Sequence, residues 1–143
     1  MQSKELLDAK NEFENICPHE YQTRIAKELY CWIIIPGWPS PDISTRDIHY
    51  EFRYSKKEGL FAECHIENEK YVYAKKIFKI LADTTKDING KKLDFFENRD
   101  YPNFRKRPSL SIRLGHNVSG ESSSKTMMEF IEKTKEQISN HLY

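Results

Sequence analysis

Acidic and histidine residues alternate with apolar residues in two neighbouring segments near the middle of the chain. Glu51 lies in the segment 48–54, and Glu63 and His65 lie in the segment 60–67. Two carboxylates and an imidazole can hold a divalent cation, and a nuclease of the PD-(D/E)XK type binds its metal through an Asp followed by Glu-x-Lys on the next strand. His65 stands where that motif has Lys. The three residues are candidates for a catalytic site, and the alternative is that they form only the wet face of a strand pair.

Positive charge gathers in one segment, 99–107, where aromatic residues interleave with it. Arginine and lysine can contact phosphates while an aromatic ring stacks on a base, so the segment predicts nucleic-acid or anion binding. The candidate residues are Arg99, Tyr101, Phe104, Arg105, Lys106, Arg107 and, further along the chain, Arg113. The alternative is a solvated loop whose basic residues offset the neighbouring Glu97 and Asp100.

Two further motifs, a phosphate-binding loop and a zinc site, are incomplete in this sequence. Gly115 and Gly120 have the spacing of a phosphate-binding loop, but Glu121 stands where that loop needs a lysine, so no nucleotide hydrolysis is expected. The cysteine and histidine pairs lack the two-residue gap of a zinc site. The sequence therefore predicts no metal site with a complete motif, and no cofactor.

Composition limits the class of protein. The chain has 143 residues, the usual size of a single domain, with 23 basic and 22 acidic residues and a net charge of +1. Such a balance gives no overall field towards nucleic acid or an anionic membrane, so charged recognition has to be local. Three widely spaced cysteines, no signal-peptide pattern and no apolar run long enough to span a membrane predict a reduced, cytoplasmic protein.

The elements that must position these residues follow from hydrophobic periodicity. Residues 3–16 and 18–35 carry apolar residues at steps of three and four, which predicts a hairpin of two helices over 1–35. The segment 36–47 is rich in proline and reads as a loop. The segment 48–54 alternates cleanly and 60–67 nearly does, which predicts a β-hairpin. The residues expected on its core side are Tyr50, Phe52, Leu60, Ala62, Cys64 and Ile66.

The rest of the chain is expected to complete one unit of two strands and a helix and to form a second such unit. A helix is expected from about residue 70 to 87, with Val72 on its inner face and Asn89-Gly90 ending it. Strands are expected over 92–97 and 109–114, and a last helix over 124–141. The fold class is thus α+β: two N-terminal helices, then a ββαββα body over 48–143 whose four-stranded, mainly antiparallel sheet packs against helices.

The body resembles an uncharacterised ββαββα domain found in bacterial defence and restriction proteins, often behind nuclease domains. The similar segments are 49–53, 61–66 and 88–93, together with the closing amphipathic helix. The resemblance implies an accessory or recognition role beside an effector and transfers no catalytic residue.

Since no complete catalytic set is found, the leading hypothesis is a non-enzymatic binding or regulatory domain that recognises nucleic acid or an effector protein in a defence context. The alternative is a divalent-metal-dependent phosphodiesterase or nuclease that uses the polar face of the first hairpin. A third hypothesis is a structural subunit whose interface contains Trp38, Tyr71 and Tyr73.

Overall fold

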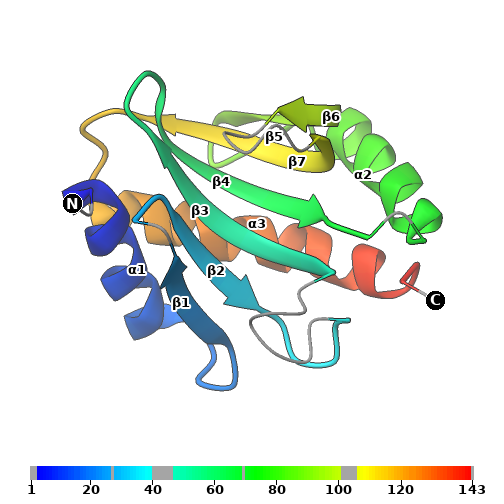
Figure 1. The fold of residues 1–143 in the computed structure, drawn as a ribbon, viewed down its shortest axis with the longest axis horizontal. Helices are drawn as coiled ribbons and strands as arrows, with labels where there is room; N and C mark the ends of the chain where they lie inside the picture. Colours follow the sequence, from blue (N-terminus) through cyan, green and yellow to red (C-terminus); the bar gives the residue numbers. More distant parts are fainter. Residues whose placement is uncertain (1–2, 27, 40–46, 69, 101–105, 143) are drawn as a thin grey trace.

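The described residues form one antiparallel sheet of seven strands and three helices. The helices pack on one face of this sheet (Figure 1). The computed structural model describes residues 3–26, 28–39, 47–68, 70–100 and 106–142, without the side chains of residues 26, 98–100 and 106. In chain order the elements are α1 (Lys4–Ile16), β1 (Gln22–Ala26), β2 (Tyr30–Ile34), β3 (Ile48–Ser55), β4 (Gly59–Ile66), α2 (Val72–Thr85), β5 (Asp87–Ile88), β6 (Lys91–Asp100), β7 (Lys106–Gly115) and α3 (Gly120–Ser139). The strand order in the sheet is β1-β2-β3-β4-β7-β6-β5.

The core lies between the sheet and the helices. Helix α3 runs behind the middle of the sheet in Figure 1, with α1 near one end of it and α2 near the other. Tyr50 of β3 packs edge-on against Phe130 of α3, and Phe52 packs edge-on against Phe13 of α1. Aromatic rings on alternate residues of β3 therefore hold two helices against the same face of the sheet.

The predicted hairpin over 48–66 is present as β3 and β4. Glu51 pairs with Glu63, and His49 pairs with His65. Residues of even number on these strands face the helices, as the alternation indicated, and Tyr50, Phe52 and Cys64 are completely buried. This register also fixes which polar residues share the opposite face, because neighbouring residues of a strand point to opposite sides.

The predicted second helix over 18–35 is wrong, because this part of the chain forms the antiparallel strands β1 and β2. Cys31 and Ile33 are buried in the core, whereas Trp32 between them is half-buried and its ring lies against His49 on the other face, which is a period of two. The segment Tyr30–Ile34 consists of aromatic and β-branched residues with one cysteine, and these fit a pleated surface better than a helix. The apolar residues of 18–35 that are three and four positions apart therefore belong to two strands and not to one face of a helix.

The four-stranded sheet is therefore also a wrong prediction, and the sheet has seven strands. The strands β1 and β2 account for two of the additional strands, and β5 is the third. Asn89 and Gly90 both have positive φ and connect β5 to β6, so they form a tight hairpin turn and do not end the preceding helix. The helix α2 ends earlier, at Thr85.

The other two helices lie close to where the sequence predicts them. Ser3 caps α1 as expected, because its side chain accepts a hydrogen bond from the backbone of Leu6. The helix α3 begins at Gly120, four residues before the expected start, and Ser119 is its cap. Within the described part of the chain, no helix combines the length and the apolar character needed to cross a membrane.

Candidate functional site

The face of the sheet that points away from the helices carries a row of charged and polar side chains at its centre. Glu51 on β3 lies opposite Glu63 on β4, and Glu63 in turn lies opposite Ser111 on β7. The next row contains His49, His65 and Ser109. We call Glu51, Glu63, His65, His49, Arg53 and Ser111 the polar network. Three central strands, adjacent in the sheet, thus position it.

The polar network is buried, which corrects the expectation of a wet strand face. His49 and Glu63 have no exposed surface, Glu51 is 4% exposed and Arg53 is 7% exposed. Charged side chains are almost never this deeply buried unless they are paired. Each charged side chain of the network therefore needs a partner of opposite charge or a hydrogen bond.

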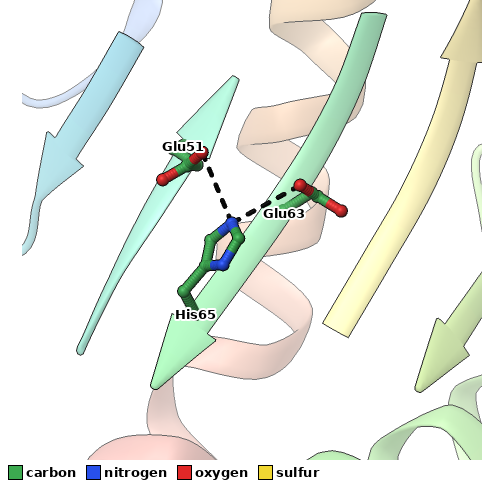
Figure 2. A group of neighbouring side chains, drawn as sticks. All are labelled: Glu51, Glu63 and His65. Atoms are coloured by element: carbon green, nitrogen blue, oxygen red, sulfur yellow. Dashed lines mark ion pairs between the residues drawn. The ribbon is translucent and has the colours of Figure 1, made fainter. Parts of the chain in front are cut away.

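His65 connects the two carboxylates. Its Nε2 lies 3.4 Å from Oε2 of Glu51 and 3.4 Å from Oε1 of Glu63, and both contacts are drawn in Figure 2. The figure shows the imidazole between the two acids, with α3 behind the strands. The sequence hypothesis placed these three residues together, and the structure brings them together.

Further donors hold each carboxylate. Arg53 Nε donates to Oε1 of Glu63 over 2.7 Å, and the Ser111 hydroxyl donates to Oε2 of Glu63 over 2.6 Å. Nε2 of His49 lies 2.8 Å from Oε1 of Glu51, and the His49 ring stacks on the His65 ring at 5.6 Å between centroids. Both oxygens of each carboxylate therefore have a partner within the network.

The pKa values in the network follow from these contacts. Burial alone raises the pKa of Glu51, but the charge of His65 and hydrogen bonds from His49 and His65 outweigh it and lower the pKa to about 2. Burial likewise opposes the charge of Glu63, and bonds from His65 and Arg53 hold its pKa far below the usual range. Burial lowers the pKa of His65, yet the two carboxylates raise it to about 10.

The ionised groups of the network balance at neutral pH. Glu51 and Glu63 are negative, while Arg53 and His65 are positive. Two carboxylates directly opposite each other on neighbouring strands repel, and the two cations remove that repulsion. The arrangement is a neutral ion-pair network, which is the form in which charges are tolerated inside a protein.

The geometry also resembles a metal site, because one ligand atom from each of Glu51, Glu63 and His65 lies within 4.8 Å of the others. A metal needs the neutral imidazole, however, so it has to displace the proton of His65. With a pKa of about 10, that displacement weakens binding at pH 7 by about three orders of magnitude, or about 4 kcal/mol. The adjacent Arg53 cation opposes a second positive charge in the same place.

The basic candidates are not assembled into one surface by the described residues. Tyr101, Phe104 and Arg105 lie outside the described residues, and the side chains of Arg99 and Lys106 are not described. Arg107 and Arg113 lie six residues apart on β7, which separates them by about 20 Å. Arg107 is half-buried and Arg113 is exposed. The nucleic-acid hypothesis stays a prediction.

The segment with phosphate-loop spacing is an ordinary helix start. The Ser119 hydroxyl accepts a hydrogen bond from the backbone of Ser122, and Lys125 pairs with Glu121 at 2.9 Å. A side chain at Gly120 would collide with the backbone oxygen of Asp8, at 2.7 Å from the added atom. The glycine therefore serves the close approach of α3 to α1.

The cysteines have the properties of packing residues. All three are free thiols, and Cys31 and Cys64 are buried in the core. Burial raises the pKa of Cys31 to about 12 and that of Cys64 well above its ordinary value. A thiol that stays protonated at neutral pH is a poor nucleophile.

The aromatic residues of the third hypothesis divide into two groups. Trp38 is buried and its Nε1 donates to the Ser139 hydroxyl over 2.8 Å, and Tyr71 is buried with its hydroxyl on Asp47. Tyr73, in contrast, is 60% exposed. Only Tyr73 of the three is available for an interface.

The outer face of α2 is a surface that the sequence reasoning missed. Among the described residues, five large hydrophobic side chains are exposed, and Val72, Tyr73 and Ile80 of α2 are three of them. The prediction placed Val72 inward, but it is 50% exposed. Tyr73 and Ile80 are seven residues apart and off the buried stripe, and that spacing is the sequence signal that could have found this face.

We define the α2 outer face as Val72, Tyr73, Lys76, Lys79 and Ile80. Tyr73, Lys76 and Ile80 follow one another at steps of three and four, so they lie along one side of the helix. The Lys76 ammonium lies 5.4 Å from the centre of the Tyr73 ring. The face thus combines an apolar stripe with positive charge.

No family model, no curated protein and no solved structure matches the chain. The resemblance of residues 48–143 to the ββαββα domain of defence proteins therefore stays a prediction.

Proposed function

We propose that the protein is a non-enzymatic binding domain that docks a protein partner on the α2 outer face. The observation that carries the proposal is the exposure of Val72, Tyr73 and Ile80 on one side of a helix whose other side, with Phe78 and Leu81, is buried in the core. Apolar side chains grouped on one helix face are a common mark of a protein interface. Tyrosine is also among the residues enriched in such interfaces.

The polar network supports a binding role more than a catalytic one. A catalytic metal needs ligands that can release their protons and an open position for water or substrate. The oxygens of Glu51 and Glu63 already accept from His49, His65, Arg53 and Ser111, and the group is buried. We assign the network to the stability and register of the central strands.

Site-specific photo-crosslinking in the cells that produce the protein tests the docking role. A photo-reactive benzoylphenylalanine in place of Tyr73 or Ile80 is expected to give one discrete adduct of higher mass. The same group in place of Gln137, an exposed residue of α3, is the matched control and should give none. Equal adducts at all three positions, or no adduct from α2, would refute the proposal.

The phosphodiesterase alternative deserves a test because its three ligand atoms are so close together. Calorimetric titration with Mg²⁺ and with Mn²⁺ at pH 7 is expected to give no heat of binding. Binding that is lost in Glu63→Gln would restore the metal site and would contradict the assignment of the network to stability.

A further inference from the structure

We infer that the segment docked on the α2 outer face is an acidic amphipathic helix of the partner protein. The inference rests on the proposed function and names the class of ligand for the same site. It is carried by the shape of the apolar stripe and by the charge that accompanies it.

The shape of the stripe fits a helix. From Val72 to Ile80 the stripe is about 12 Å long, since an α-helix rises about 1.5 Å per residue. Tyr73 and Ile80 project from the same side of α2, about two turns apart. An amphipathic helix with apolar residues at i, i+4 and i+7 shares the seven-residue spacing of Tyr73 and Ile80, and it can pack along α2 with its side chains between those of the stripe.

The charge of the stripe selects an acidic partner. The helix α2 carries three lysines and one aspartate, whereas α1 carries two lysines and four acidic residues, and α3 carries three lysines and four acidic residues. The one helix with a positive balance is therefore the helix with the largest exposed apolar stripe. Lys76 lies within the stripe and Lys79 lies beside it, where glutamates flanking a partner's apolar stripe would meet them.

An anionic membrane is the weaker fit to the same face. Stable electrostatic attachment to lipid uses a cluster of about four to eight basic residues. On α2, Lys75 is already paired with Glu97 of β6 at 2.9 Å, and Asp83 sits at the C-terminal part of the helix. Lys76 and Lys79 alone are too few for a lipid surface but enough to orient a single helix.

The test uses a synthetic acidic amphipathic helical peptide, with leucines at i, i+4 and i+7 and flanking glutamates, as the probe. Binding is measured by fluorescence anisotropy at low and at physiological salt. We expect saturable binding that weakens with salt and falls about tenfold in the Lys76→Glu/Lys79→Glu variant. The matched control Lys125→Glu/Lys133→Glu makes the same change of charge on α3, and it should bind like the unmodified protein.

Several outcomes would overturn the inference. They are equal binding of a peptide with lysines in place of the glutamates, no binding of the acidic peptide, or tighter binding to phosphatidylserine vesicles or to a single-stranded oligonucleotide. The photo-crosslinking separates this failure from that of the docking role. An adduct at position 73 whose yield is unchanged by Lys76→Glu/Lys79→Glu keeps the docking face and removes the acidic helix, whereas loss of every α2 adduct removes the docking face itself.

Discussion

At the scale of single residues, the protein places two glutamates directly opposite each other in the interior and neutralises them with one arginine and one histidine. Glu51 and Glu63 are cross-strand partners, and Arg53 and His65 provide the two positive charges. Removing one partner from such a network strongly destabilises the protein, because the remaining partner is then a buried, uncompensated charge.

The variant Arg53→Met removes the guanidinium that pairs with Glu63 and keeps an apolar side chain in its place. We expect the free energy of unfolding to fall by about 3 to 5 kcal/mol in urea titrations. The control is Arg113→Met, on an exposed residue of the same sheet face, which should change stability by less than about 0.5 kcal/mol. Equal effects of both variants would show that the Arg53 ion pair is not a stabilising contact.

Two serines of β7 offer a matched pair. The Ser111 hydroxyl donates to Glu63, whereas the Ser109 hydroxyl is buried without a hydrogen-bond partner among the described residues. Ser111→Ala should therefore cost about 1.5 to 3 kcal/mol, the range for a bond to a charged group. Ser109→Ala should be neutral or slightly stabilising. Thermal unfolding of both variants decides, and the opposite order would contradict the network as described.

Stability should decline with rising pH just above neutrality. The pKa of His65 is raised to about 10 in the folded protein, against about 6.5 in an unfolded chain. Its contribution is therefore complete below about pH 6.5 and is lost as the pH rises towards 10, with a slope of at most about 1.4 kcal/mol per pH unit. Urea unfolding between pH 6.5 and 8 isolates this effect, because the buried cysteines contribute only above the pKa of an unfolded thiol, about 8.5.

The variant His65→Gln is the control for that pH series. It removes the titrating group, so its stability should be lower but flat between pH 6.5 and 8. A slope that persists in the variant would assign the pH dependence to another group.

At the acidic end, the depressed pKa of Glu51, about 2, stabilises the fold above about pH 4.5, and that contribution is lost as the pH falls towards 2.

At the scale of the elements, the turn between β3 and β4 brings two backbones unusually close together. Gly59 has a φ of +87°, and an added Cβ would lie 2.4 Å from the backbone carbonyl of Gly115 on β7. Gly90, in the β5–β6 turn, has a φ of +78° but open space around it. We predict that Gly59→Ala destabilises the protein by several kcal/mol more than Gly90→Ala, which should cost about 1 kcal/mol. Similar losses in both variants, measured by urea unfolding, would contradict the close approach.

Strand alternation was the dependable signal in the sequence, and helical spacing was not. The segment 48–54 alternates without exception and 60–67 does so except at Phe61, and β3 and β4 follow these segments. The segment 18–35 matched a helical stripe, yet Cys31 and Ile33 have the alternating burial of a strand. The spacing pattern had too few apolar residues to separate the two periods, and β-branched content was the better guide there.

The sequence was enough to predict which residues of the candidate site lie together, but not that they are buried. The alternation alone places Glu51, Glu63 and His65 on one face of the hairpin, and the register then sets Glu51 opposite Glu63. Ser111 comes from β7, and its place beside β4 depends on a strand order that no local pattern contains. The burial of the network depends on the whole fold, and so the sequence suggested a wet face where the structure has a neutral, buried one.

At the scale of the whole molecule, the protein keeps its charge balanced inside and divides it unevenly outside. The net charge is +1, yet α2 is positive while α1 and α3 are negative. A net charge near zero gives no general attraction to nucleic acid, while a local excess of positive or negative charge attracts partners to one particular face. The helix with the positive excess also has the largest exposed apolar stripe, which is the basis of the docking proposal.

The most direct measurement of that claim is fluorescence-detected sedimentation of the labelled protein in an extract of the cells that produce it. We predict that the protein sediments as a complex larger than its own 17.0 kDa, and that Tyr73→Glu/Ile80→Glu sediments as the isolated chain while Leu7→Glu, an exposed apolar residue of α1, stays in the complex. Sedimentation of the unmodified protein as an isolated chain, or a complex that survives Tyr73→Glu/Ile80→Glu, would contradict the α2 outer face as the docking site.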